Sequence, residues 1–217
     1  MPSSQETGKP GLRERKKAAT RKAISDVATA LFIQRGFEAV TLAEVAEAAG
    51  VSVNTIFNYF STKEELFFDQ GDDLVEEPTR VVRERRPGET PIDALARVTR
   101  GALAGDRSLL FGRNVRPFLA TVEASPALRA RERVLYDEAE ERLTAGLIDE
   151  GVAAPRARIA AALVIAAQWR LVKEFRARLL ADEPEDQLRA AMGQSVELVI
   201  EALRDGLGGL PRREEAV

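Results

Sequence analysis

The apolar positions of this chain recur at steps of three and four residues, the spacing that places them on one face of an α-helix. The pattern is clear between Leu12 and Arg35, and Gly36 is a residue type that often ends a helix. The apolar positions of this segment are Ala19, Ala23, Ile24, Val27, Ala30 and Leu31. No stretch of any length alternates apolar and polar residues as a β-strand does, so the sequence predicts an all-α protein.

Capping residues predict two short helices after the first one. Thr41 and Glu44 have the spacing of a capping box, so a helix is expected over 42–49. Ser52 is a good N-cap for a further helix over 53–59. The N-terminal part therefore begins with three consecutive helices.

A fourth helix is expected to begin at Lys63, behind Ser61 or Thr62 as N-cap, and to run toward Glu77. Pro78 then kinks or stops it, because proline lacks an amide proton and its ring clashes with the preceding turn.

Proline and glycine also divide the rest of the chain. The segment 83–91 contains two prolines and a glycine, which predicts a loop or hinge. Helices are expected over 92–104, after Asp106, after Pro117, and over 126–150, 155–181 and 184–207. Each of the last three has a proline near its first turn, where the missing amide proton costs least. The predicted architecture is a group of short helices followed by a larger helical bundle.

The composition removes several classes of function. The chain has no cysteine and no histidine, which excludes disulfides, thiolate metal sites and the commonest general base. We therefore expect a binding protein and not an enzyme, with neither a metal nor a cofactor. The N-terminus lacks the apolar core of a secretory signal, and the longest apolar run, Ile159–Trp169, is about half the length that spans a bilayer. A cytoplasmic protein is expected, without a membrane partner.

Positive charge is concentrated near the N-terminus. Residues 1–63 carry nine Lys or Arg and six Asp or Glu, a net charge of +3, whereas the whole chain has −3. Six of these nine cations lie between Arg13 and Lys22. Such an excess indicates a polyanionic partner, although a basic cluster is also typical of a solvated helix face.

The two short helices have the spacing of a helix-turn-helix unit. Ala46 is the small residue where the helices cross, Gly50 tolerates the turn, and Val51 and Ile56 are apolar anchors of the second helix. The alternative is an αα-corner that packs and does nothing else.

The outward positions of the second helix favour DNA binding over simple packing. These positions are Ser52, Val53, Asn54, Thr55, Asn58 and Tyr59, with Lys63 just beyond. None is acidic, whereas a solvated helix face usually mixes basic and acidic residues, as the arginines and glutamates of residues 129–142 do here. Hydroxyl and amide side chains can donate to phosphates or read base edges.

Residues 12–75, with the core GFEAVTLAEVAEAAGVSVNTIFNYFSTKEELF, resemble the DNA-binding domain of the TetR (tetracycline-repressor-like) family of bacterial regulators. The family's strongest signature is a recognition helix T-[LI]-Y-x-[YH]-F followed by a lysine, and this chain reads TIFNYFSTK. The resemblance implies that Thr41, Tyr59 and Lys63 contact phosphates. It places Ser52, Val53, Asn54, Thr55 and Asn58 in the DNA groove.

One position departs from the family pattern. Phe57 stands where the family commonly has tyrosine, so a phenolic hydrogen bond is missing, and Phe57 either stacks on a sugar or fills the domain core. Asn58 is then the expected reader of an adenine edge. The basic residues Arg13, Arg15, Lys16 and Lys17 could reach the backbone or minor groove, or simply solvate the start of the first helix.

The resemblance also implies the organisation of the whole chain. The expected parts are a disordered tail over 1–11, a helix-turn-helix domain over 12–62, a connecting helix over 63–85, a ligand-binding and dimerisation domain over 86–208 and a tail over 209–217. The last two long helices would pair with those of a second copy, so that a homodimer reads a palindromic operator in double-stranded DNA. A monomer that buries the same apolar residues internally is the alternative.

The family typically releases DNA when a small molecule binds the larger domain. Candidate pocket residues are the aromatics Phe111, Phe118, Tyr136, Trp169 and Phe175, which could equally be core. The predicted function is a ligand-responsive repressor. A ligand-independent regulator or an activator of the same fold is an alternative.

Two other classes of protein remain open from the residues alone. The first is an all-α enzyme that uses the carboxylates of Asp137, Glu138, Glu140 and Glu141, which ion pairing along one helix explains better. The second is an adaptor whose 53–59 face binds protein.

Overall fold

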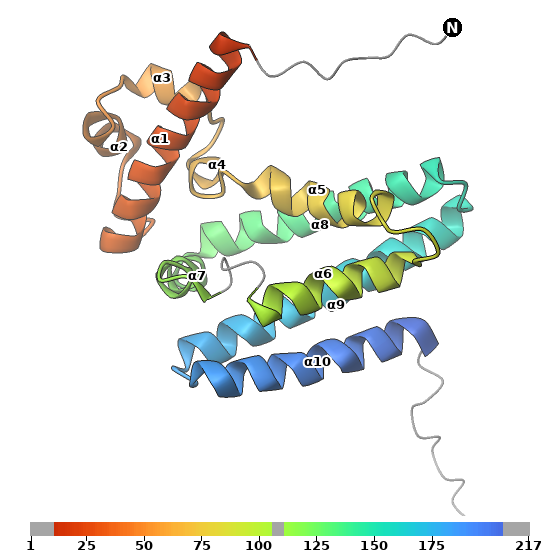
Figure 1. The fold of residues 1–217 in the computed structure, drawn as a ribbon. Coiled ribbons are helices and arrows are strands. Elements are labelled where there is room, and N and C mark those ends of the chain that lie inside the picture. The colour runs from red at the N-terminus through yellow and green to blue at the C-terminus, as the bar shows by residue number, and fades with distance from the viewer. Residues whose placement is uncertain (1–10, 106–110, 206–217) are drawn as a thin grey trace, which may run out of the picture. The chain divides into compact units, whose positions relative to one another are not determined.

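The computed structural model describes residues 11–105 and 111–205, and helix is their only regular secondary structure (Figure 1). The chain divides into two compact units, Met1–Asp69 (unit 1) and Gln70–Val217 (unit 2). The tail expected over 1–11, Gly11 apart, the helix expected after Asp106 and the tail over 209–217 lie outside the described residues. Among the described helices, none is long and apolar enough to cross a membrane.

The described part of unit 1, residues 11–69, contains four helices. They are α1 (Leu12–Arg35), α2 (Leu42–Ala48), α3 (Val53–Phe57) and α4 (Lys63–Phe67). The expected boundaries of α1 are confirmed, and α2 ends one residue early. Helix α3 ends at Phe57 and continues as a turn, in which the amides of Tyr59 and Phe60 both donate to the carbonyl oxygen of Ile56 at 2.9 Å.

The core of unit 1 is aromatic and aliphatic. Phe32 from α1, Phe37 from the following turn and Phe67 from α4 meet with ring centroids 5.0–6.1 Å apart. The other buried apolar residues of the unit are Ile24, Ala28, Val40, Val45, Ala46, Ile56, Phe60 and Leu66. Residues from all four helices share this core, so α2 and α3 are held on α1 and α4 by burial and not by their own short length.

The prediction of one continuous helix from Lys63 toward Glu77 is wrong. Helix α4 ends at Phe67, Phe68 has a non-helical backbone, and α5 runs from Gly71 to Arg83. The reason is that α4 packs into the core of unit 1, whereas α5 belongs to unit 2.

Pro78 also behaves differently from the prediction, because it lies inside α5 and does not end it. Its ring is buried on the same face of α5 as Val75 and Val82. Burial of this face against α8 outweighs the one backbone hydrogen bond that proline cannot make.

Unit 2 is a bundle of long helices (Figure 1). Besides α5 it contains α6 (Pro91–Ala104), α7 (Val115–Ala124), α8 (Pro126–Asp149), α9 (Ala154–Leu180) and α10 (Glu185–Asp205). Apart from α7, these helices start within one residue of the predicted positions. Helix α7 starts at Val115, before Pro117, so this proline lies in its first turn.

The helices of unit 2 form a closed arrangement in which α5 packs on α8, α8 on α9, α9 on α10, α10 on α6 and α6 on α5. Helix α7 lies against α8 and α9. The contact between α5 and α8 is especially close, because a Cβ atom added at Gly146 would lie 2.7 Å from the Cγ2 atom of Thr79. Ion pairs flank it, Arg142 to Glu76 at 2.7 Å and Arg85 to Glu150 at 2.8 Å.

Candidate nucleic-acid interface and ligand cavity

A capping box fixes the start of α2. The backbone amide of Thr41 donates to the Glu44 carboxylate at 2.7 Å, and the amide of Glu44 donates to the Thr41 hydroxyl at 3.3 Å. Arg35, in the last turn of α1, pairs with the same carboxylate at 2.6 Å. The Thr41 amide and Arg35 together lower the pKa of Glu44 to about 2. The Thr41 hydroxyl, which is predicted to contact a phosphate, is therefore already hydrogen-bonded to Glu44 in the free protein.

The turn between α2 and α3 has the geometry that the residue spacing predicted. Gly50 has a φ of 66°, a backbone conformation that residues other than glycine rarely adopt. The amide of Val51 then donates to the carbonyl oxygen of Ala46 at 2.9 Å. Ala46 and Ile56 are buried, which places the opposite face of α3 at the surface.

The exposed face of α3 carries two kinds of polar side chain. The hydroxyls of Ser52 and Thr55 lie 2.8 Å apart, and that of Ser52 also accepts from the Thr55 amide at 3.0 Å. Asn54 and Asn58 are exposed, and their side-chain amides make no hydrogen bond to the described residues. These two amides are therefore available to an external partner. The remaining predicted groove residue, Val53, is half-buried at the start of the helix.

Phe57 lies on the surface, with 54% of its area exposed. Its neighbours Ile56 and Phe60 occupy the core instead. The interpretation that Phe57 fills the domain core is therefore wrong, because the anchors on either side of it leave no buried position. Phe57 therefore shares the exposed surface of α3 with the side-chain amides of Asn54 and Asn58.

Lys63 and Tyr59, the two predicted phosphate contacts beyond α3, are both half-buried. The Lys63 ammonium donates to the carbonyl oxygen of Phe37 and lies 4.3 Å from the centroid of the Phe37 ring. Burial lowers the pKa of Lys63, although Glu38 and Glu64 oppose the shift. Lys63 thus joins α4 to the turn after α1, a role that the sequence did not indicate.

Arg21 is a further residue that the sequence reading missed. Its guanidinium donates to the carbonyl oxygen of Tyr59, pairs with Asp69 at 2.6 Å and lies 4.3 Å from the centroid of the Phe60 ring. It therefore holds the turn at the end of α3. Its place in the basic cluster was visible in the sequence, but its partners 38 and more residues away were not. Of the same cluster, Arg13 and Lys17 are exposed on α1.

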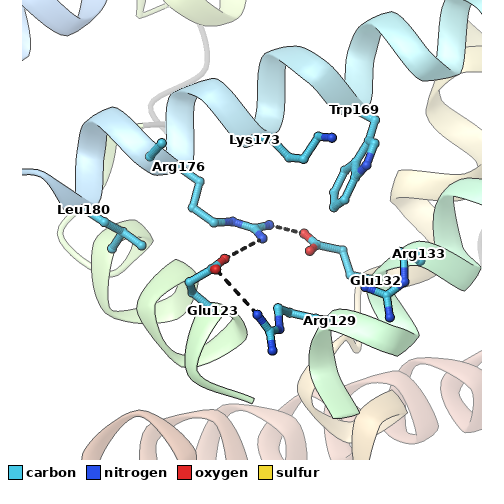
Figure 2. Close-up of a pocket in the computed structure, with 9 residues that line it drawn as sticks. Glu123, Arg129, Glu132, Arg133, Trp169, Lys173, Arg176 and Leu180 are labelled. Carbon is cyan, nitrogen blue, oxygen red and sulfur yellow. Dashed lines mark hydrogen bonds and ion pairs between the residues drawn. The ribbon is translucent and has the colours of Figure 1, made fainter. Parts of the chain in front are cut away.

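Unit 2 contains a cavity of about 420 Å³ between α7, α8 and α9 (Figure 2). Its lining residues are Glu123, Arg129, Glu132, Arg133, Trp169, Lys173, Arg176, Ala177 and Leu180. Figure 2 shows the Trp169 ring and the Arg176 guanidinium reaching from α9 toward Glu132 on α8. A second hollow of about 430 Å³ adjoins it, and the two share Trp169 and Arg133.

An ion-pair network crosses the first cavity. Arg176 pairs with Glu132 and, at 3.4 Å, with Glu123. Arg129 reaches Glu123 at 3.8 Å. The three helices that line the cavity are thereby linked by charge, because Glu123 lies on α7, Arg129 and Glu132 on α8, and Arg176 on α9.

The five candidate pocket aromatics do not gather in one place. Tyr136 and Trp169 meet with ring centroids 4.5 Å apart, and both line the second hollow. Burial raises the pKa of Tyr136. Phe111 and Phe175 instead form an edge-to-face pair at 5.6 Å. Phe175 is buried in a core cluster with Leu188 and Met192, and the partly buried Phe111 packs against that cluster. Like them, Phe118 on α7 lines neither hollow.

Comparison with known proteins identifies the N-terminal helices. Residues 24–69 match the family model for bacterial regulatory proteins of the tetR family. The HTH-type transcriptional regulator TcmR of Streptomyces glaucescens is 31% identical over 138 residues, which are 62% of this chain and 61% of TcmR. The HTH-type transcriptional regulator AcrR of Shigella flexneri is 46% identical over 48 residues, 22% of each chain. The match thus spans less than two thirds of either relative.

The fold of the larger unit is also shared with solved structures. The structure of SmeT in complex with triclosan superposes with a TM-score of 0.59, at 20% identity, and the match covers 91% of this chain and 100% of SmeT. At that identity the likeness concerns the fold alone. The family model and the relatives agree that residues 24–69 are a domain of the tetR family of bacterial regulatory proteins, and the chain as a whole shares the fold of SmeT.

Proposed function

We propose that this protein is a DNA-binding transcriptional regulator, a dimeric repressor that leaves a palindromic operator when a small molecule binds unit 2. The observation that carries the proposal is the surface of α3. It exposes Asn54, Phe57 and Asn58, and the two amides have no partner within the described residues. Such amides can form paired hydrogen bonds with an adenine edge in the major groove.

Different residues of unit 1 would have different tasks at the DNA. Asn58 and Asn54 would read bases, and Phe57 would contact a sugar or the methyl group of a thymine. Tyr59, with Arg13 and Lys17 on α1, would contact phosphates. A third group supports the reading face by capping or turning the chain. Its members are Thr41, Ser52, Thr55 and Lys63, whose polar groups are bonded inside the unit and can add phosphate contacts when they reorient.

A second copy of this chain is the partner that we propose for the exposed face of α9 and α10. Ile159 and Leu163 lie one turn apart on α9, and Leu198 lies on α10, each more than half exposed. The α10 residues Leu188, Val196 and Ile200 are instead buried within the chain, because α10 packs on α6 and α9. A two-fold pair would present two α3 helices about 34 Å apart, one turn of DNA.

The cavity beside Trp169 is the proposed effector site. Its volume of about 420 Å³ lies within the range of small-molecule pockets. SmeT, which shares the fold, binds triclosan. The cavity is lined by α8, and α5 packs along α8 and is joined to α4 by residues 68–70. A ligand that binds one arrangement of these helices better than another would shift the DNA-binding equilibrium through this connection.

Selection of bound DNA from a random library, at one fixed salt concentration, tests the proposal. We expect a palindrome whose half-sites are one helical turn apart, and binding that weakens log-linearly with added salt. A matched selection with the Asn54→Ala/Asn58→Ala variant should lose the base preference and keep the salt dependence. Recovery of no preferred sequence by the wild-type protein would contradict a sequence-specific regulator, and a half-site without its mirror image would contradict the dimer.

A further inference from the structure

We infer that the ligand of the cavity beside Trp169 is an organic anion with an aromatic body, and that its anionic group competes with Glu123 for Arg176 and Arg129. This inference rests on the proposed function, because it takes this cavity as the effector site. It adds the charge and shape of the ligand and the contact that the ligand replaces.

The lining of the cavity has an excess of positive charge. It contains four cations, Arg129, Arg133, Lys173 and Arg176, and two acids, so its formal net charge is +2. Both acids already have cationic partners, since Glu132 and Glu123 pair with Arg176 and Glu123 also reaches Arg129. Arg133 and Lys173 make no ion pair with any described residue. A ligand that compensates this charge carries one or two negative charges.

The back of the cavity contains polar groups that the protein does not satisfy. Glu132 and Arg176 are each 5% exposed. One carboxylate oxygen of Glu132 and the Nε atom of Arg176 have no hydrogen-bond partner among the described residues. Buried polar atoms without partners are uncommon, and here they belong to side chains that line a cavity. A ligand with an oxygen acceptor toward Arg176 and a hydroxyl toward Glu132 would satisfy both.

The indole ring of Trp169 indicates which ligand shape fits the cavity. The ring lines both hollows, and Figure 2 shows it facing the cavity from α9. The Lys173 ammonium lies 5.3 Å from the centroid of the ring, so a cation stands beside an aromatic surface. Ala177 and Leu180 add apolar surface. A flat ring stacked on Trp169, with an acidic substituent toward the cations, fits this arrangement.

Glu123 is the contact that such an anion would replace. Its carboxylate is the only acidic group of α7 that lines the cavity, and it is half exposed. Its distances to Arg176 and Arg129, 3.4 and 3.8 Å, are long for charge-assisted hydrogen bonds. A ligand carboxylate bound to these two arginines would replace Glu123 as their partner. The ion pairs that link α7 to α8 and α9 through Glu123 would then be broken. Ligand binding and the position of α7 are thereby coupled.

Three probes that share one ring system separate charge from shape. They are biphenyl-4-carboxylate, biphenyl-4-methanol and biphenyl-4-methylammonium. Trp169 is the one tryptophan of the chain and lines both hollows, so its fluorescence reports occupancy of either one. Lys173 and Glu123 line only the first cavity, so variants of these residues assign the binding to it, and calorimetry gives an independent affinity. We expect the carboxylate to bind roughly tenfold more tightly than the alcohol, and the ammonium more weakly than the alcohol.

Variants of the full-length protein assign the effect to residues. Arg133→Gln/Lys173→Gln should reduce affinity for the carboxylate roughly tenfold and leave the alcohol nearly unchanged. Glu123→Gln should raise affinity for the carboxylate several-fold because it removes the competing group. Arg83→Gln is the matched control, since Arg83 is exposed on α5 and lines neither hollow. Circular dichroism verifies that each variant is folded.

Several outcomes would overturn the inference. They are an alcohol or ammonium probe that binds as tightly as the carboxylate, no binding by any probe, and carboxylate affinity that Arg133→Gln/Lys173→Gln or Glu123→Gln leaves unchanged. Failure of the proposed function has a different signature, because a chain that selects no DNA can still show the charge preference at Trp169. The two proposals are therefore decided by separate measurements.

Discussion

The Lys63 ammonium donates to the carbonyl oxygen of Phe37, which precedes it by 26 residues, and lies over the ring of the same phenylalanine. The first residue of α4 is thereby fastened to the turn that follows α1. The ring of Phe37 in turn packs on Phe32 and Phe67. A residue that the recognition motif assigns to a phosphate thus has a structural contact in the free protein, and the two roles have different experimental signatures.

Lys63→Ala is expected to lower the free energy of unfolding by about 1 kcal/mol, because it removes a hydrogen bond and a cation–π contact at a half-buried site. DNA affinity should fall for all sequences alike. Denaturant unfolding and DNA titration at several salt concentrations measure both effects. If the slope of log affinity against log salt concentration becomes shallower by about 1, Lys63 contacts a phosphate as well. If that slope is unchanged, the role of Lys63 is structural.

A control for Lys63→Ala is Lys22→Ala. Lys22 is an exposed lysine of the same unit, paired with Asp26 one turn away at 2.7 Å. Exposed pairs of this kind contribute little, so the unfolding free energy should change by less than about 0.5 kcal/mol. A loss as large as that of Lys63→Ala would contradict a special contact at Phe37.

Asn58→Ala is expected to relax the base preference at one position of each half-site. A bidentate amide contact to adenine contributes about 1–3 kcal/mol of discrimination, and the Asn58 side chain has no partner among residues 11–105 and 111–205 that would be lost. Quantitative binding to operators with each base at each position measures the change. Unchanged preference at every position would show that Asn58 is not a reader.

Phe57→Tyr is expected to raise affinity for all DNA sequences several-fold. The side chain is 54% exposed, so the added hydroxyl has room and can donate to a phosphate oxygen. The salt slope should stay the same, because a neutral hydroxyl releases no counterion. Stability should change by less than about 0.5 kcal/mol at such an exposed site. Weaker binding by Phe57→Tyr would instead indicate that Phe57 makes an apolar contact with DNA.

Glu44 should make the stability of unit 1 depend on pH in the acidic range. Its pKa of about 2 lies below the ordinary value of 4.5, so its contribution to stability is present above pH 4.5 and is lost as the pH falls toward 2. Glu44→Gln, which keeps the shape of the cap without the charge, should therefore be less stable than the wild type near pH 6. The difference should disappear near pH 2.

Thermal unfolding followed by the NMR methyl signals of Val40 and Val45 measures this difference within unit 1, since both residues are buried there. Other carboxylates titrate in both proteins and cancel in the comparison. A difference that stays constant between pH 6 and pH 2 would contradict the assignment to Glu44.

Local patterns in the sequence were sufficient for most of the helix starts and for the turn between α2 and α3. Each successful prediction used a signal that spans no more than a few neighbouring residues. The structure confirms the capping box of Thr41 and Glu44, Gly50 in the turn, and the prolines near the starts of α8 and α9. Such signals are local because capping and turn conformations depend on neighbouring backbone groups.

Features that depend on distant partners were not predictable in this way. Lys63 and Arg21 contact residues 26 and 38 positions away, and no local pattern encodes such pairs. The break after Phe67 is set by which unit each helix packs in, which propensity does not contain. Phe175 is assigned to the core and Trp169 to a cavity by their neighbours on other helices, although both lie in the same helix.

The contact between Gly146 and Thr79 predicts that α5 and α8 cannot tolerate a methyl group between them. In Gly146→Ala the new Cβ would lie 2.7 Å from the Thr79 Cγ2 atom, so the stiff β-branched side chain of Thr79 or the helices themselves would have to move. Overpacking of this kind costs about 1–3 kcal/mol, which exceeds the gain of about 1 kcal/mol from replacing a helical glycine by alanine. Denaturant unfolding should therefore show a net loss of stability.

Two further variants separate the clash from the helix preference. Thr79→Ser removes the Cγ2 atom. The stability cost of Gly146→Ala should therefore be much smaller in the Thr79→Ser background than in the wild type. Gly193→Ala, in α10, meets no atom within 4 Å and should stabilise the protein by about 0.5–1 kcal/mol. If Gly146→Ala is as favourable as Gly193→Ala, the two helices can separate at no cost, and their close approach cannot limit how a change at the cavity reaches α5.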